Sequence, residues 1–178
     1  MLFRSKLDAA RGSDPEKFGN PLISDVITNV TSPEPCKPDS PCPTVFNDLG
    51  RVQLRLGLKD LGTTASPTAA TTNNEVTITR YHVTYRRTDG RNTPGTDVPY
   101  PFDGGVTATV CSCSSGVTLS FEVVRHDAKM ESPLIQLKTN PGILNAIADV
   151  TFYGRDRVGN DVSVTGSLLV DFGNFGDS

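Results

Sequence analysis

The chain has 178 residues, of which 36% are hydrophobic and 21% are charged, and its formal net charge at pH 7 is -3. This length suits one ordinary domain with a tail, large enough to bury a continuous core. A pI near 5.3 excludes a broad cationic surface, so nucleic acid is a poor candidate partner. No apolar run approaches the roughly 20 residues of a membrane-crossing helix, so we expect no transmembrane segment.

The first 20 residues have no clear hydrophobic period and predict a disordered tail. They also lack the apolar segment of a secretory leader. The opening MLFRS (residues 1–5) is what the end of a common sequencing adapter encodes when it is translated. We therefore expect an artefactual start with the true leader lost upstream; the alternative is a genuine polar start.

Residues 21–44 predict an edge strand followed by a Pro/Cys-rich loop. The segment LISDVITNV (22–30) is compatible with a strand or with a short helix, and we favour a strand. Five prolines in residues 31–44 remove ladder hydrogen bonds, so no regular element is expected there.

Residues 45–178 alternate apolar and polar side chains in runs separated by Thr, Ser, Gly and Pro, which is typical of an all-β domain. The predicted strands cover residues 51–58, 75–87, 106–110, 117–123, 146–154 and 162–172. The low-complexity segment 62–74 predicts a mobile loop. Ser132 before Pro133 predicts the start of a short helix on a crossover between sheets.

The segment EVTITRYHVTYRRTDG (75–90) is the most informative stretch of the chain. Its apolar residues predict a strand whose inward side chains are Ile78, Tyr81, Val83 and Tyr85. Inward side chains of a strand are normally two residues apart, but Ile78 and Tyr81 are three apart. We therefore expect one irregularity near residues 79–80, where the inward positions change from even to odd numbers.

The I-x-x-Y-x-V-x-Y spacing of this strand, followed by Asp89-Gly90, resembles the third strand of fibronectin type III domains. The segment YGRDRVGND (153–161) is similar to a turn of bacterial surface immunoglobulin-like repeats. Residues 43–176 are also similar to uncharacterised bacterial envelope proteins with phrases like RNTPG-x-DVPY-x-FDG. These resemblances imply an immunoglobulin-like, fibronectin type III-like antiparallel β-sandwich with one short crossover helix. They also imply an exported protein, secreted or anchored to the cell envelope, for example as a lipoprotein, and no known activity.

An even number of cysteines, four, favours disulfides formed in an oxidising compartment. Cys36 and Cys42 flank the proline-rich loop, and Cys111 and Cys113 lie at a strand end. We expect local closure of Cys36 with Cys42; cross-pairing between the loop and the strand end is the rival. Because the spacings are not those of a zinc ribbon, we expect no cofactor.

A basic cluster surrounds the strand at residues 75–87. Its members, with one tyrosine, are Arg80, Tyr85, Arg86, Arg87 and Arg91. They predict either a weak binding site for an anionic polymer such as an acidic glycan, or a solvated outer face of the sheet.

Three oxygen-bearing residues, Asp156, Asn160 and Asp161, suggest a weak calcium site, joined by Asp103 or Asp171 if the ends of the sandwich converge. The alternative is a turn in which aspartate side chains accept hydrogen bonds from backbone amides.

Enzyme chemistry has little support, because there are only two histidines and no nucleophile elbow, P-loop or zinc-protease motif. We therefore expect a non-catalytic exported envelope protein that binds another protein or assembles through its sheet edges. A glycan-binding module is the alternative, and a calcium-binding adhesion-type domain is more remote. The expected partner is a protein or a glycan at the cell surface.

Overall fold

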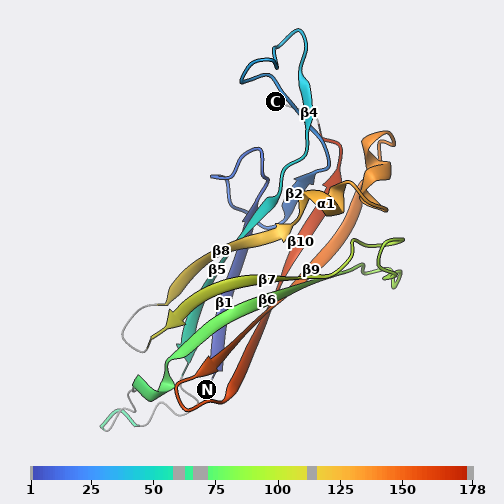
Figure 1. Cartoon of the computed structure of the whole chain (residues 1–178). Coiled ribbons are helices and arrows are strands. Elements are labelled where there is room, and N and C mark those ends of the chain that lie inside the picture. Colours follow the sequence, from blue (N-terminus) through green and yellow to red (C-terminus); the bar gives the residue numbers. More distant parts are fainter. Residues whose placement is uncertain (1, 58–62, 66–71, 112–115, 176–178) are drawn as a thin grey trace.

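The structure is a computed structural model that describes residues 2–57, 63–65, 72–111 and 116–175 (Figure 1). Over these residues the architecture is all-β, as predicted, with three short helical segments. A three-stranded sheet has the order β1 (Leu2–Ala10), β5 (Asp48–Gly57), β8 (Val117–Val124). A five-stranded sheet has the order β2 (Leu22–Asp25), β10 (Asp161–Gly173), β9 (Leu144–Asp156), β6 (Val76–Arg86), β7 (Phe102–Val110). A two-stranded sheet pairs β3 (Thr28–Val30) with β4 (Cys42–Thr44).

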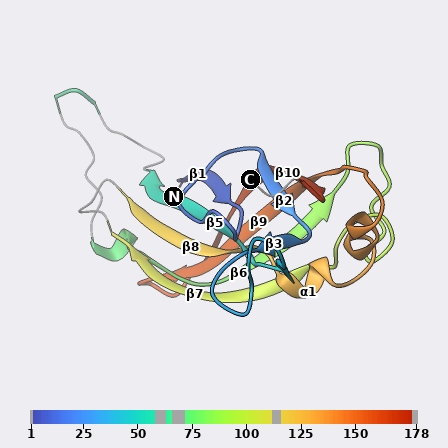
Figure 2. The same ribbon diagram turned by 90° about the horizontal axis from the view of Figure 1, so that it is seen from above.

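The two larger sheets face each other across one hydrophobic core, and the five-stranded sheet curves from β7 round to β2 (Figure 2). The sheets form because alternate side chains of each strand are apolar and point inward. Aromatic rings fill the space between them: the ring centroid of Phe121 on β8 lies 5.2 Å from those of both Tyr81 and Phe152. No tryptophan is needed to fill this core.

The parity shift predicted within β6 is confirmed. The pairing of β6 with both neighbours shifts between Ile78 and Arg80, which is a β-bulge. As a result Ile78, Tyr81, Val83 and Tyr85 are all buried. The ring of Tyr81 on β6 lies against Gly104 on β7. A Cβ atom at position 104 would come within 2.3 Å of a ring carbon, so this register requires glycine there.

The expected disordered tail over residues 1–20 is corrected by the structure. Residues 2–10 form β1, which pairs antiparallel with β5 along its whole length. The pairing uses backbone hydrogen bonds, which need no apolar period, and among residues 6–10, whose side chains the structure describes, Leu7, Ala9 and Ala10 contribute apolar burial. Ala9, Leu22 and Val26 belong to the same core as the later strands, so the expected divisions at residues 20 and 44 do not separate structural units.

The strand expected at residues 22–30 forms in two pieces. The first, β2, pairs parallel to β10, and the second, β3, pairs with β4. The expectation that residues 31–44 hold no regular element is wrong for Cys42–Thr44. Pro43 is tolerated in β4 because this short ladder has only one partner strand.

The crossover between β8 and β9 carries the expected helix, in two short segments: α1 (His126–Lys129) and the 3-10 helix η2 (Leu134–Lys138). The fully buried Leu134 anchors η2 to the core. Ser132 does not cap it; its hydroxyl accepts a hydrogen bond from the Gln136 amide instead. Residues 62 and 66–71 of the loop predicted at residues 62–74 lie outside the described residues; of the rest, residues 63–65 form no helix or strand and Thr72–Asn74 form a 3-10 turn, η1. None of the helices described here has the length and apolar character required to cross a membrane.

Candidate functional site

A narrow arm projects from the body of the molecule beyond the ends of the main strands (Figure 1). We define the arm as residues 28–44, which comprise β3, the proline-rich segment and β4. The arm begins and ends at a ladder that pairs Thr28 with Thr44 and Val30 with Cys42. Residues 31–41 are exposed except for the half-buried Cys36, and the hydrophobic core contains no residue of the arm.

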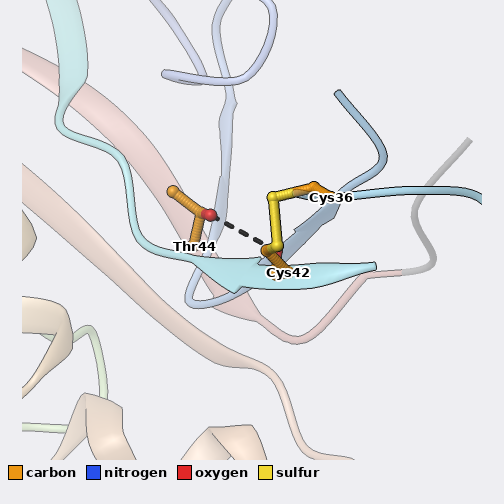
Figure 3. Close-up of a disulfide and its surroundings, with 3 residues drawn as sticks. All are labelled: Cys36, Cys42 and Thr44. Atoms are coloured by element: carbon orange, nitrogen blue, oxygen red, sulfur yellow. Dashed lines mark hydrogen bonds between the residues drawn. A yellow bond between two sulfur atoms is a disulfide. The ribbon is translucent and has the colours of Figure 1, made fainter. Parts of the chain in front are cut away.

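The arm is held in shape by local bonds. A disulfide joins Cys36 to Cys42 across a Cα–Cα distance of 5.3 Å (Figure 3). Within this ring the amides of Lys37 and Ser40 each donate to the carbonyl of the other, which closes a tight turn around Pro38 and Asp39. The predicted disulfide between Cys36 and Cys42 is confirmed, and a disulfide between either of them and the strand end at Cys111 and Cys113 is excluded. Cys111 is also disulfide-bonded, and Cys113 lies outside the described residues.

A polar hollow of about 490 Å³ opens at the root of the arm. Its wall is formed by one flank of the arm, the turn after β1 and the end of β2, including Arg11, Asp14, Asp25 and Asn29. Asp25 is almost fully buried. Its carboxylate accepts hydrogen bonds from the Thr28 hydroxyl at 3.5 Å and from the Phe175 amide at 3.2 Å, so the root is fixed to the C-terminal segment.

Beneath the root, a buried ion pair joins Lys129 of α1 to Asp48 at the start of β5, with 2.8 Å between Nζ and Oδ2. The Ser24 hydroxyl donates to the same oxygen at 2.6 Å, and the Gly12 amide donates to Oδ1 at 2.8 Å. Four segments therefore meet at one carboxylate. Neither Asp48 nor Lys129 was predicted, because a buried charge pair between distant segments leaves no periodic signal in a sequence.

The structure divides the predicted basic cluster. Tyr85 is 6% exposed and donates its hydroxyl proton to the Val123 carbonyl inside the core, where burial raises the pKa of Tyr85. It therefore cannot contribute to a surface site. Arg87 and Arg91 both bind Asp89 in the loop after β6.

The other two arginines of the cluster, Arg80 and Arg86, lie on the outer face of the five-stranded sheet, and each has an aspartate partner. Arg86 binds Asp149 at 2.6 Å, and Arg80 contacts Asp103 at 3.3 Å. The expectation of a solvated outer face is consistent with this pairing, because the aspartates offset the positive charge.

A second hollow, of about 520 Å³, lies where the β-bulge turns Arg80 toward β9. The guanidinium of Arg80 stacks on the ring of Tyr153 at 3.8 Å from its centroid. Arg155 and Asp161 form an ion pair at 2.8 Å on the wall of the same hollow. Tyr153 was not predicted as a ligand residue, although its outward parity next to Arg155 on a predicted strand is a signal that points to it.

The predicted calcium ligands form a turn. The Asp156 carboxylate accepts hydrogen bonds from the backbone amides of Val158 and Asn160 and from the Asn160 side chain, which lower the pKa of Asp156. Asp161 binds Arg155 instead of converging with them. Over the residues that the structure describes, no three His, Cys, Asp or Glu side chains are arranged to hold a metal ion.

The two histidines lie apart and both contact carboxylates. The Nδ1 atom of His82 lies 3.2 Å from Asp103, and the Nε2 atom of His126 lies 2.9 Å from Asp127. Asn47 accepts a hydrogen bond from the His126 amide. Neither contact joins a histidine to a described serine or cysteine.

Comparison with known proteins adds no relative: no family model, curated protein or solved structure matches this chain.

Proposed function

We propose that this protein is a non-catalytic, exported protein of the bacterial cell envelope that binds another protein through its arm. The projecting arm carries the proposal. A ladder, a disulfide and several prolines fix the conformation of a segment that contributes nothing to the core. Because the fold does not need this rigidity, we infer that it serves binding, where a preorganised surface loses less conformational entropy on association.

We further propose that the fold is an immunoglobulin-like sandwich of the fibronectin type III-like kind. The strand order supports this assignment. If β1, β5, β6, β7, β8, β9 and β10 are taken as strands A, B, C, C′, E, F and G, then A, B and E share one sheet. In the other sheet, strands G, F, C and C′ then follow one another as in variable-type immunoglobulin domains, and β2 is added parallel to G at the edge. The arm is then an insertion between the first strands and strand B.

Export is supported by cysteine chemistry. The half-buried Cys36–Cys42 disulfide lies in the arm, outside the hydrophobic core, and Cys111 is oxidised as well. Disulfides of this kind persist in oxidising compartments such as the periplasm or the cell surface. We propose a secreted or envelope-anchored protein on this ground.

The test of the protein-binding proposal places a photoreactive amino acid at Asp39 in the arm and, as a matched control, at the exposed Val158 in the turn between β9 and β10. The protein is then irradiated on cells of the source organism. We expect one discrete crosslinked protein from the Asp39 variant and none from the Val158 variant. Equal labelling at the two positions, or none at Asp39, would contradict a binding role for the arm.

A glycan-binding role is a second candidate, and the hollow beside Tyr153 favours it. An aromatic ring flanked by guanidinium and carboxylate groups offers both stacking and paired hydrogen bonds to a sugar. A glycan array that includes acidic polysaccharides tests this role. Binding that is lost in Tyr153→Ala, and kept in the Asp39→Ala variant of the arm, would assign the function to the hollow; an array without any signal would exclude it for those glycans.

A further inference from the structure

The polar hollow at the root of the arm (the root hollow) contains a cation without a counter-charge. Arg11, in the turn after β1, is part of its wall and also borders a smaller hollow of about 270 Å³. The Arg11 side chain is partly buried, and among the residues that the structure describes it has no hydrogen bond or ion pair. Its guanidinium therefore has unused donors beside open space.

The other partly buried arginines indicate what such a group binds in this protein. In the described part of the chain there are three of them, and each lies within 3.6 Å of a carboxylate oxygen. The pairs are Arg51 with Asp8, Arg87 with Asp89 and Arg125 with Glu122. Guanidinium and carboxylate groups match because they form charge-assisted hydrogen bonds, often two in parallel. Arg11 is thus the partly buried arginine that lacks the group to which the others are bound.

The two carboxylates in the wall of the root hollow are already engaged. Asp14 binds Lys17, with 2.8 Å between Oδ2 and Nζ. Asp25 is 4% exposed, and its two oxygens accept hydrogen bonds from the Thr28 hydroxyl and the Phe175 amide. The arrangement therefore favours a carboxylate from a ligand at Arg11 over a further ion pair within the wall.

The wall around Arg11 is held in place by the fold. The amide of Gly12, the next residue, donates to Asp48 at 2.8 Å, and the Asn47 carbonyl leaves no room for a Cβ atom at position 12. The arm contributes residues 28–32, which begin with β3 and its ladder to β4. A ligand would therefore order little more than the Arg11 side chain, which keeps the entropic cost of binding low.

The root hollow and the arm form one continuous surface, because residues 28–32 belong to both. A protein that covers this flank of the arm also covers the hollow. We propose that the protein partner of the arm places an aspartate or glutamate side chain in the root hollow, where Arg11 binds its carboxylate. Hydroxyl groups of Ser13, Thr31 and Ser32 in the same wall are further donors for it. This inference rests on the proposed protein-binding function and adds the chemistry by which the partner is recognised.

Photocrosslinking locates the contact. A photoreactive amino acid replaces the exposed Ser13, and the protein is irradiated on cells of the source organism, as for the variant at Asp39. Mass spectrometry of the crosslinked peptides then identifies the attachment site. We expect both variants to capture the same protein, and the Ser13 variant to attach close to an aspartate or glutamate of that protein.

Calorimetric titration with the captured protein, once purified, tests the charge pair. Arg11→Gln should weaken binding about tenfold or more, because a charge-assisted pair is lost. Replacing the partner's acid by the corresponding amide should weaken it equally, and the two changes together should be no worse than either one. Arg55→Gln is the matched control, since Arg55 is exposed on β5 outside the root hollow, and it should leave the affinity unchanged.

Thermal melts exclude a structural cause, because Arg11 has no bond within the described fold and Arg11→Gln should melt like the wild type. Additive losses in the titration, or a partner whose binding Arg11→Gln does not weaken, would overturn this inference and leave the function of the arm standing. Capture at Asp39 with none at Ser13 would do the same. Capture of no protein at either position would overturn both, and a captured carbohydrate would assign the root hollow to an anionic glycan instead.

Discussion

Lys129 and Asp48 are two charges that the fold removes almost completely from water, with exposures of 1% and 0%. Burial raises the pKa of the Asp48 carboxyl, and the Lys129 ammonium opposes this rise together with the hydrogen bonds from Ser24 and Gly12. Removing one member would leave the other buried without a counter-charge, which is the most costly change that can be made to such a pair.

We therefore expect Lys129→Ala to lower the free energy of unfolding by about 3–5 kcal/mol. The double variant Lys129→Met with Asp48→Leu should lose much less, because no charge is left unpaired. Urea denaturation measures both, with Lys37→Ala in the exposed arm as the control. A loss below about 1 kcal/mol for Lys129→Ala would show that water reaches the pair.

Asp89 gives a prediction about pH. Hydrogen bonds from Arg91, and then from Arg87, lower the pKa of Asp89 to about 2. Because this value lies below the ordinary pKa of about 4, the stabilising contribution of Asp89 is present above pH 4. It is lost as the pH falls from about 4 through 2. A carboxyl ¹³C NMR titration should place the midpoint near 2, and Arg91→Ala should move it upward; an unchanged midpoint in that variant would mean that Arg91 is not the cause.

At the level of elements, β1 pairs with β5 along its whole length, and its described side chains Leu7, Ala9 and Ala10 add apolar burial. Deleting residues 2–10 should expose the edge of β5 and lower the free energy of unfolding by about 2 kcal/mol or more through lost apolar burial. Hydrogen exchange should become faster at the β5 amides that faced β1. Unchanged stability and exchange would restore the interpretation of these residues as a tail.

The arm disulfide should stabilise the arm and not the body. In the double variant Cys36→Ser with Cys42→Ser, the amides of Lys37 and Ser40 should lose their protection from hydrogen exchange, because the turn that they close is no longer pinned. The melting temperature of the body should change by only a few degrees, since the arm has no residue in the core. A much larger decrease would mean that the arm packs against the body.

The strands that the sequence predicts are those in which the period of two coincides with burial, such as β5, β6, β9 and β10. Even the bulge of β6 could be predicted, because the apolar residues on its two sides require opposite parity. The strands that were missed, β1 and β4, are held by backbone pairing, which does not depend on side-chain pattern.

The candidate site could be predicted less well, because proximity in sequence is not proximity in space. Tyr85 and Arg86 are neighbours in the chain, yet on a strand they point to opposite faces, one into the core and one to the outside. The root of the arm depends on segments that meet only after folding, as Gly12, Ser24 and Lys129 do at Asp48. The Cys36–Cys42 pairing was predictable because it is local.

For the molecule as a whole, stability depends on the single core between the two larger sheets. Leu54 of β5 is fully buried, whereas Leu56 on the same face is only partly buried at the margin. Leu54→Ala should cost about 2–5 kcal/mol, and Leu56→Ala about half as much, because the space left at a margin is open to solvent. Chemical denaturation of both variants measures the difference. Equal losses would mean that the core extends past Leu56.

The two ends of the arm meet at its base, where Thr28 pairs with Thr44. A segment whose ends are already joined in this way can be exchanged for another hairpin of different length or chemistry without moving the strands that follow it. Selection on recognition can therefore act on the arm while selection on folding acts on the core, with little conflict between them. Among relatives of this chain, the arm should diverge in sequence and length far faster than the sheets that carry it.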